Sequence, residues 1–150
     1  MSNLRDKIKM SKDEMTIFLQ NQISLQIGTI NKDGSPHLST MWYLYDGENF
    51  IFHTYTKSQK VLNLKRDSRI TVLAEAGAEY SDLQGVIAYG NTEIINGKDN
   101  QEEVIRYMEI VGEKYIKDED GAQYIEGMKL QAPKRSVVIV KPSKFISWDH

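Results

Sequence analysis

Apolar and polar residues alternate through the first third of the chain in the pattern of β-strands. From Ile23 to Gly28 every second residue is apolar, and the stretches 36–45 and 50–56 are rich in aromatic and β-branched residues. Asp-Gly pairs at 33–34 and 46–47 separate these three segments, and Asp-Gly is typical of tight hairpin turns. The pattern therefore predicts three strands joined as an antiparallel meander.

Four other segments have helical spacing. Residues 11–20 open with Ser11 and Glu14 in the spacing of a capping box. A short helix follows the third strand, with Val61 and Leu64 facing inward. Apolar residues keep helical spacing over 99–117, and a last helix over 122–130 is expected to end before Pro133.

Three later segments, 69–76, 85–95 and 136–149, complete the strands. Gly90 within the second and Pro142 within the third indicate bulges or bends, as barrels require. Strands and helices do not alternate along the chain, which argues against a parallel doubly wound sheet. The sequence predicts one α+β domain over residues 1–150, mainly β: an antiparallel barrel of six or seven strands with short peripheral helices.

The amino-acid composition excludes several kinds of functional site. The chain has no cysteine, which excludes disulfides, thiolate catalysis and cysteine-based zinc sites. His37, His53 and His150 have no metal-binding spacing, so we expect no metal, and no catalytic triad can be defined. The net charge of −2 shows no excess of basic residues that would favour binding of nucleic acid. No signal peptide or apolar run of about 20 residues is apparent, so we expect a cytoplasmic protein without a membrane partner.

The stretch "TYTKSQK", residues 54–60, places Lys60 in the first turn of the predicted short helix. A helix N-terminus carries partial positive charge, so a lysine there is unfavourable unless an anion is also present. Backbone N–H groups and the hydroxyls of Thr54, Thr56 and Ser58 suit a phosphate. The alternative is plain N-capping by Thr56 or Ser58, with Lys60 pointing into water.

The strand "HLSTMWYLY", residues 37–45, has an unusual mixture of side chains. Hydroxyls, a thioether and aromatic rings could line a flat heteroaromatic ring. They could equally line a dimer interface, where Tyr, Trp and Met are enriched. The residues alone leave both interpretations open.

Residues 27–73 resemble the core of the pyridoxamine 5′-phosphate oxidase-like split-barrel flavoproteins. More narrowly, they resemble the flavin/deazaflavin oxidoreductases, B group. The resemblance lies in the order of "DGSPHLS", an aromatic strand, an apolar strand reaching "HTYT", and K-x-x-N-L-x-R-D-x-R before a further strand. It extends over residues 12–149, because "GVIAYGNTEII", a helical hairpin and "VVIVKPSKFISWD" follow in the family's order.

The resemblance implies a homodimer of split β-barrels with a cofactor, FMN, at each of two sites in the subunit interface. The partner subunit would close the site through Tyr89 or Trp148. The residues implied for the cofactor phosphate are Thr54, Ser58, Gln59 and Lys60, and those implied near the tricyclic ring are Ser39, Thr40, Met41, Trp42, Tyr55 and Thr56.

The function implied is a flavin-dependent oxidoreductase that moves hydride to or from a small organic substrate, with no obligatory catalytic side chain. One alternative is a deazaflavin-dependent reductase, whose polyanionic coenzyme tail would favour Lys57, Lys65 or Arg66. Another is a non-enzymatic module that binds flavin or haem. The R-x-x-L-L-K motif and the C-terminal Arg/His pair of true pyridoxamine phosphate oxidases are absent, so we do not expect that activity.

Overall fold

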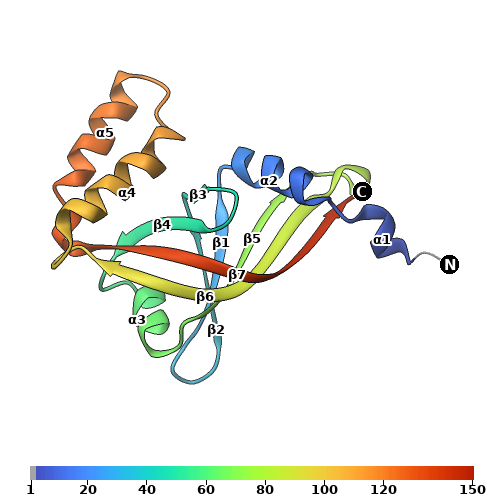
Figure 1. The fold of residues 1–150 in the computed structure, drawn as a ribbon, viewed down its shortest axis with the longest axis horizontal. Coiled ribbons are helices and arrows are strands. Elements are labelled where there is room, and N and C mark those ends of the chain that lie inside the picture. Colours follow the sequence, from blue (N-terminus) through green and yellow to red (C-terminus); the bar gives the residue numbers. More distant parts are fainter. Residues whose placement is uncertain (1–2) are drawn as a thin grey trace.

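The computed structural model describes residues 3–150 and contains a strongly curled, seven-stranded antiparallel sheet (Figure 1). The strands lie in the order β2-β1-β5-β6-β7-β4-β3. This confirms the predicted α+β barrel. The strand bounds are β1 Leu25–Ile30, β2 Pro36–Met41, β3 Leu44–Tyr45, β4 Phe50–Tyr55, β5 Arg69–Ala76, β6 Gln84–Asn96 and β7 Arg135–Asp149.

Short helices lie around the sheet. They are α1 Leu4–Ile8, α2 Lys12–Asn21, α3 Gln59–Arg66, α4 Gln101–Glu113 and α5 Glu119–Lys129, with 3-10 turns at Tyr80–Asp82 and Ala132–Lys134. The capping box of Ser11 and Glu14 is present at the start of α2, as predicted. Within residues 3–150, each helix is too short or too polar to span a lipid bilayer.

The predicted meander is present, but its second pairing is only two residues long. β2 pairs with β1, whereas β4 pairs with the two-residue β3 at the end of the predicted strand 36–45 and, on its other side, with β7. The predicted strand 36–45 breaks between β2 and β3, where fully buried Tyr43 turns into the core and its hydroxyl donates to the carbonyl of Leu19. β2 therefore ends the sheet with one free edge, and the barrel is split.

The longest pairing joins β6 to β7 and carries the predicted bulge. The register shifts between Tyr89 and Gly90. A Cβ on Gly90 would lie 2.2 Å from the Lys141 carbonyl oxygen, so only glycine allows this close approach. β7 continues through Pro142 as one strand, so Pro142 does not divide it.

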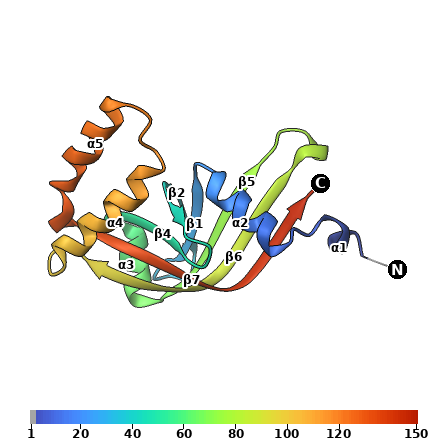
Figure 2. The ribbon, with the colours of Figure 1, turned by 45° about the horizontal axis from the view of Figure 1, so that its top comes forward.

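Two apolar clusters lie on opposite faces of β4. Phe50 and Phe52 point into the barrel, where Val61 and Leu64 of α3 join them, as predicted. Ile51 points the other way, into a second cluster with α4. The α4–α5 hairpin therefore covers the outside of β4 and its neighbours at one end of the sheet (Figure 2).

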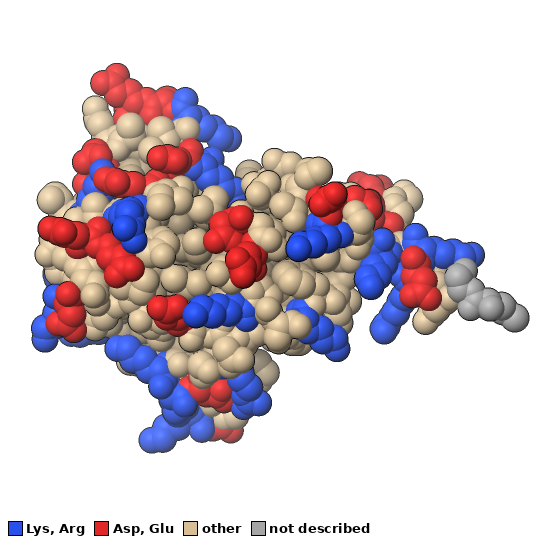
Figure 3. Space-filling view, viewed as in Figure 1, with Lys and Arg blue, Asp and Glu red and all other residues tan. Residues whose placement is uncertain are grey.

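Charged side chains of both signs are interspersed over the face shown in Figure 3. Acidic side chains gather at the top, over the start of α5, where Glu119 and Asp120 lie. Basic side chains gather at the bottom, over α3 and the turn between β1 and β2. The surroundings of α3 are therefore more basic than the net charge of the chain suggests.

Candidate functional site

The start of α3 leaves a hydroxyl without a hydrogen-bond partner. β4 ends at Tyr55, a tight turn follows, and Ser58 is the N-cap residue. Its side chain makes no capping bond, and its buried Oγ has no hydrogen-bond partner among residues 3–150. The Thr56 hydroxyl is not a cap either, because Oγ1 lies 2.8 Å from Ser136 Oγ. The plain-capping interpretation is therefore wrong, and the amide-rich entrance to α3 remains available to a ligand.

Lys60 lies in the first turn of α3 and is half-buried rather than directed into water. Burial lowers the pKa of its ammonium group below the usual value. Within residues 3–150, no carboxylate lies within 4.0 Å of it. A half-buried cation at the positive end of a helix is unfavourable, and a bound anion would relieve both penalties.

Asn63 fixes the orientation of α3. It is fully buried, and its Nδ2 donates to Thr29 Oγ1 at 3.0 Å and to Asn31 Oδ1 at 2.9 Å. Its Oδ1 accepts a hydrogen bond from Gln59 Nε2 at 2.8 Å. Lys60 lies three residues before Asn63 and so shares its helix face, the face that packs against β1.

The inner face of β2 adds two more side chains without partners. His37 lies opposite Thr29 in the β1–β2 register, and Ser39 lies opposite Ile27. Like Ser58 Oγ, the buried atoms His37 Nδ1 and Ser39 Oγ have no hydrogen-bond partner in the described part of the chain. Buried polar atoms are rarely left unpaired, so these three mark a place for a polar ligand on the elements around Lys60.

A small cavity, here called the hairpin cavity, opens on the other side of β4. Its volume is about 200 Å³. The residues that line it are Thr40, Met41, Trp42, His53, Val111, Gly112, Tyr124, Ile125, Met128 and Arg135. Trp42 stacks on Tyr115, with ring centroids 4.2 Å apart and planes 1° apart. A second cavity of about 350 Å³ shares Trp42, Tyr124 and Ile125 as walls. The end of β2 therefore borders a largely aromatic space.

Arg135 is the cation of the hairpin cavity. Its guanidinium donates to Gln131 Oε1 from Nε and Nη2 at 3.3 and 3.1 Å, and its Nη1 lies 3.3 Å from His53 Nδ1. It also lies 4.3 Å above the Tyr55 ring, whose hydroxyl donates to Gln131. The sequence pattern does not predict this group, because Gln131 and Arg135 fall between the predicted helix and the predicted strand.

Burial, together with the smaller effect of the positive charge of Arg135, lowers the pKa of His53 to about 4. His53 is therefore neutral near pH 7, and its Nδ1 can accept a hydrogen bond from Arg135.

The depressed pKa of His53 predicts a pH-dependent stability. Its native pKa of about 4 is below the ordinary value of 6.5. The unfolded chain therefore takes up a proton first as the pH falls, and stability is lost. Between about pH 7.5 and about pH 5.5 we expect the free energy of unfolding to fall by roughly 1 to 1.5 kcal/mol from this group. Urea unfolding at both pH values should show this loss in the wild type and not in His53→Gln.

His150 provides the matched control, because its ring lies beside Tyr80 near the end of the chain. His150→Gln should keep the wild-type pH dependence. If the free energy of unfolding of His53→Gln depends on pH as in the wild type, the imidazole is not held neutral in the folded protein.

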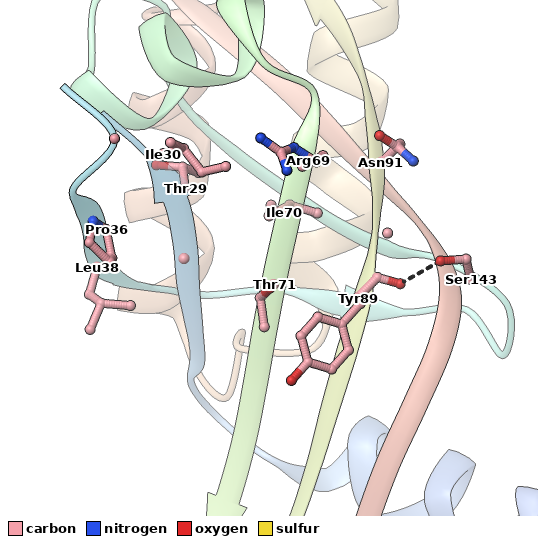
Figure 4. Close-up of a pocket in the computed structure, with 13 residues that line it drawn as sticks. Thr29, Ile30, Pro36, Leu38, Arg69, Ile70, Thr71, Tyr89, Asn91 and Ser143 are labelled. Atoms are coloured by element: carbon pink, nitrogen blue, oxygen red, sulfur yellow. Dashed lines mark hydrogen bonds between the residues drawn. The ribbon is translucent and has the colours of Figure 1, made fainter. Parts of the chain in front are cut away.

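The outer face of the sheet carries a groove of about 550 Å³ (Figure 4). Leu38, Gly28, Thr71 and Tyr89 lie side by side across β2, β1, β5 and β6. The side chains of Leu38, Thr71 and Tyr89 project from this face (Figure 4), and Gly28, which has no side chain, also lines the groove. Leu38 is 75% exposed, so the groove presents an uncovered apolar surface.

The residues predicted for the cofactor are divided between the two sides of β4. Ser39 and Thr54 point into the barrel, and Ser58 and Lys60 follow at the start of α3. Thr40, Met41 and Trp42 border the hairpin cavity, and Tyr55 lies under Arg135 next to it. The polar side chains of two others are already bonded within the chain: Thr56 to Ser136 and Gln59 to Asn63. Predicted Trp148 lies over Gly85 of its own chain.

Comparison with known proteins agrees with the fold. Residues 11–149 match the family described as Pyridoxamine 5′-phosphate oxidase. A conserved hypothetical protein, Rv2991 from Mycobacterium tuberculosis, has a crystal structure that is 34% identical in sequence, with a TM-score of 0.83 over 99% of this chain and 91% of that one. No curated protein matches the sequence.

More distant structures share the fold alone. An F420 reductase is 20% identical, with a TM-score of 0.65 over 86% of this chain and 93% of that one. HutZ, a haem storage protein from Vibrio cholerae, is 13% identical, with a TM-score of 0.71 over 90% of this chain and 93% of that one.

Proposed function

This chain belongs to the pyridoxamine 5′-phosphate oxidase family, and from that premise we propose that it is an FMN-dependent oxidoreductase. The observation that carries the proposal is Lys60, a half-buried cation without a carboxylate partner among residues 3–150, next to the unpartnered Ser58 hydroxyl. The phosphate of FMN would supply an anion that neutralises Lys60. We assign it to the α3 N-terminus, with Lys60 as the counter-charge and Ser58 as a hydrogen-bond donor.

The tricyclic ring is assigned to the free edge of β2. An edge strand presents unpaired backbone N–H and C=O groups, which suit the polar edge of a flavin ring. Ser39 Oγ lacks a partner on the inner face of this strand, and Met41 and Trp42 provide apolar surface at its end. These features favour the ring interpretation for the inner face and the end of this strand, whereas Leu38 lies on its outer face.

Bound FMN supplies hydride-transfer chemistry. The chain itself would hold the phosphate at α3, orient the ring along β2 and keep water from one side through the aromatic wall around Trp42. No side-chain acid or base is required for these roles, which agrees with the scattered histidines.

A deazaflavin coenzyme is the second candidate, and one feature favours it. A cavity of about 420 Å³ next to Tyr55 and Thr56 is lined by Lys57, Lys98 and Lys134. A coenzyme with a longer anionic tail would use these three lysines, whereas FMN would not reach beyond the α3 site. The F420 reductase among the similar folds agrees with this alternative. Arg66, predicted for the same role, instead donates to the Ile30 carbonyl and to Asn63.

We also propose that the chain is a homodimer with the cofactor sites at the subunit interface. The groove around Leu38 and Tyr89 is the surface that a second copy would cover, because its apolar side chains are exposed in one chain. Sedimentation of the purified chain is expected to give the mass of a dimer.

Absorbance tests the proposed function directly. Protein purified from its native host is expected to be yellow, with a flavin band near roughly 450 nm that follows FMN released on denaturation. A blue-shifted band would instead identify the deazaflavin candidate. FMN-loaded protein should oxidise NADPH with a quinone as acceptor. Colourless protein that binds neither coenzyme on titration would reject both candidates.

A further inference from the structure

We propose that the hairpin cavity binds small planar carboxylic acids, with Arg135 holding the carboxylate. That these acids are substrates rests on the proposed function, whereas the binding site itself does not.

Arg135 forms no salt bridge with any residue that the structure describes. Within residues 3–150, no carboxylate lies within 4.0 Å of its guanidinium. Its two acceptors, Gln131 Oε1 and His53 Nδ1, are neutral. An arginine that borders a cavity and contacts only neutral groups is a recognition element for an anion.

The guanidinium also has donors to spare. Arginine carries five N–H donors, and three are used: Nε and one N–H of Nη2 by Gln131, and one N–H of Nη1 by His53. One N–H on each terminal nitrogen remains, and that pair matches the two oxygens of a carboxylate. The Tyr55 ring at 4.3 Å holds the guanidinium plane in place.

The walls of the cavity determine the rest of the ligand. Apart from Thr40, His53 and Arg135, its lining is apolar or aromatic, with Trp42, Tyr124 and Met128 among the large side chains. About 200 Å³ accommodates a single ring with its carboxylate, and the adjoining cavity behind Trp42 extends the space. A sugar or a polyphosphate would leave its polar groups unpaired against these walls.

The position of this site relates it to the proposed cofactor. Thr40 and Met41 line the cavity and belong to β2, the edge strand to which we assign the ring, and Trp42 directly follows them. A conjugated acid held by Arg135 would therefore lie next to the ring, with its unsaturated carbons toward β2.

Binding of trans-cinnamate, compared with its uncharged analogue cinnamamide, tests this proposal in full-length protein as purified. Titration by NMR should show that the wild type binds the acid about tenfold more tightly than the amide. Arg135→Gln should lose this preference and Arg135→Lys should keep part of it. Lys134→Gln, which removes the adjacent charge from a different cavity, should keep all of it. The ratio of acid to amide affinity is measured within each variant, so a general loss of stability does not imitate the result.

An equal affinity of the wild type for acid and amide, or an unchanged preference in Arg135→Gln, would overturn the proposal. Repeating the titration with and without FMN separates it from the proposed function. If the protein binds the acid through Arg135 but does not bind FMN, the proposed function is rejected and this site is retained. FMN binding without any acid preference would reject this site alone.

Discussion

Replacing Lys60 by alanine is expected to weaken FMN binding by about 30-fold to 150-fold, which corresponds to about 2 to 3 kcal/mol. Lys60 is half-buried at the start of α3 and has no carboxylate partner among the described residues, so a phosphate there gains a charge-assisted bond. Quenching of FMN fluorescence on titration measures the affinity of each variant.

The same substitution should not destabilise the protein without cofactor. Burial lowers the pKa of Lys60, which means that its charge is unfavourable in the folded state. Lys65, exposed in the last turn of the same helix, provides the matched control, and Lys65→Ala should bind FMN like the wild type. Wild-type affinity in Lys60→Ala would remove the phosphate from this site.

Replacing Asn63 by alanine is expected to lower the free energy of unfolding by about 3 to 4 kcal/mol. The fully buried amide bonds Thr29 and Asn31 on the β1 side of the fold, and Gln59 and Arg66 within α3. Its loss would leave the buried Thr29 hydroxyl unpaired and remove three partly buried hydrogen bonds that tie α3 together and to Asn31. Because Asn63 orients the helix face that carries Lys60, we also expect weaker FMN binding. Urea unfolding and FMN titration measure the two effects.

Asn100→Ala is the control for this prediction. Asn100 is exposed at the start of α4, and its side chain bonds only the carbonyl of Asn96. A change within about 0.5 kcal/mol is expected. A similarly small effect of Asn63→Ala would mean that packing of Val61 and Leu64, rather than the amide network, positions α3.

The local elements of the fold were predictable because each depends on residues close in sequence. The turns at Gly34 and Gly47, the helix with inward-facing Val61 and Leu64, and the bulge at Gly90 were all predicted and are present. The break between β2 and β3 was not predictable in this way. Burial of Tyr43 breaks the strand at a long-range contact with α2, which no local pattern records.

The candidate site, too, was predictable only where it depends on residues close in sequence. The unfavourable placement of Lys60 follows from its position at a helix start, so local reasoning was sufficient to find it. Arg135 was not found, because its importance depends on His53 and Gln131 meeting it from another strand and from the end of the hairpin. Likewise, the hydroxyl of Thr56 looked available until β7 placed Ser136 against it.

The most direct measurement of the central claim is the difference in affinity between FMN and riboflavin, which differ only in the phosphate. Wild-type protein is expected to prefer FMN by at least about 30-fold, and Lys60→Ala should lose most of that preference while its affinity for riboflavin stays the same. Equal binding of FMN and riboflavin by the wild type would contradict the account, because nothing at the start of α3 would then recognise an anion.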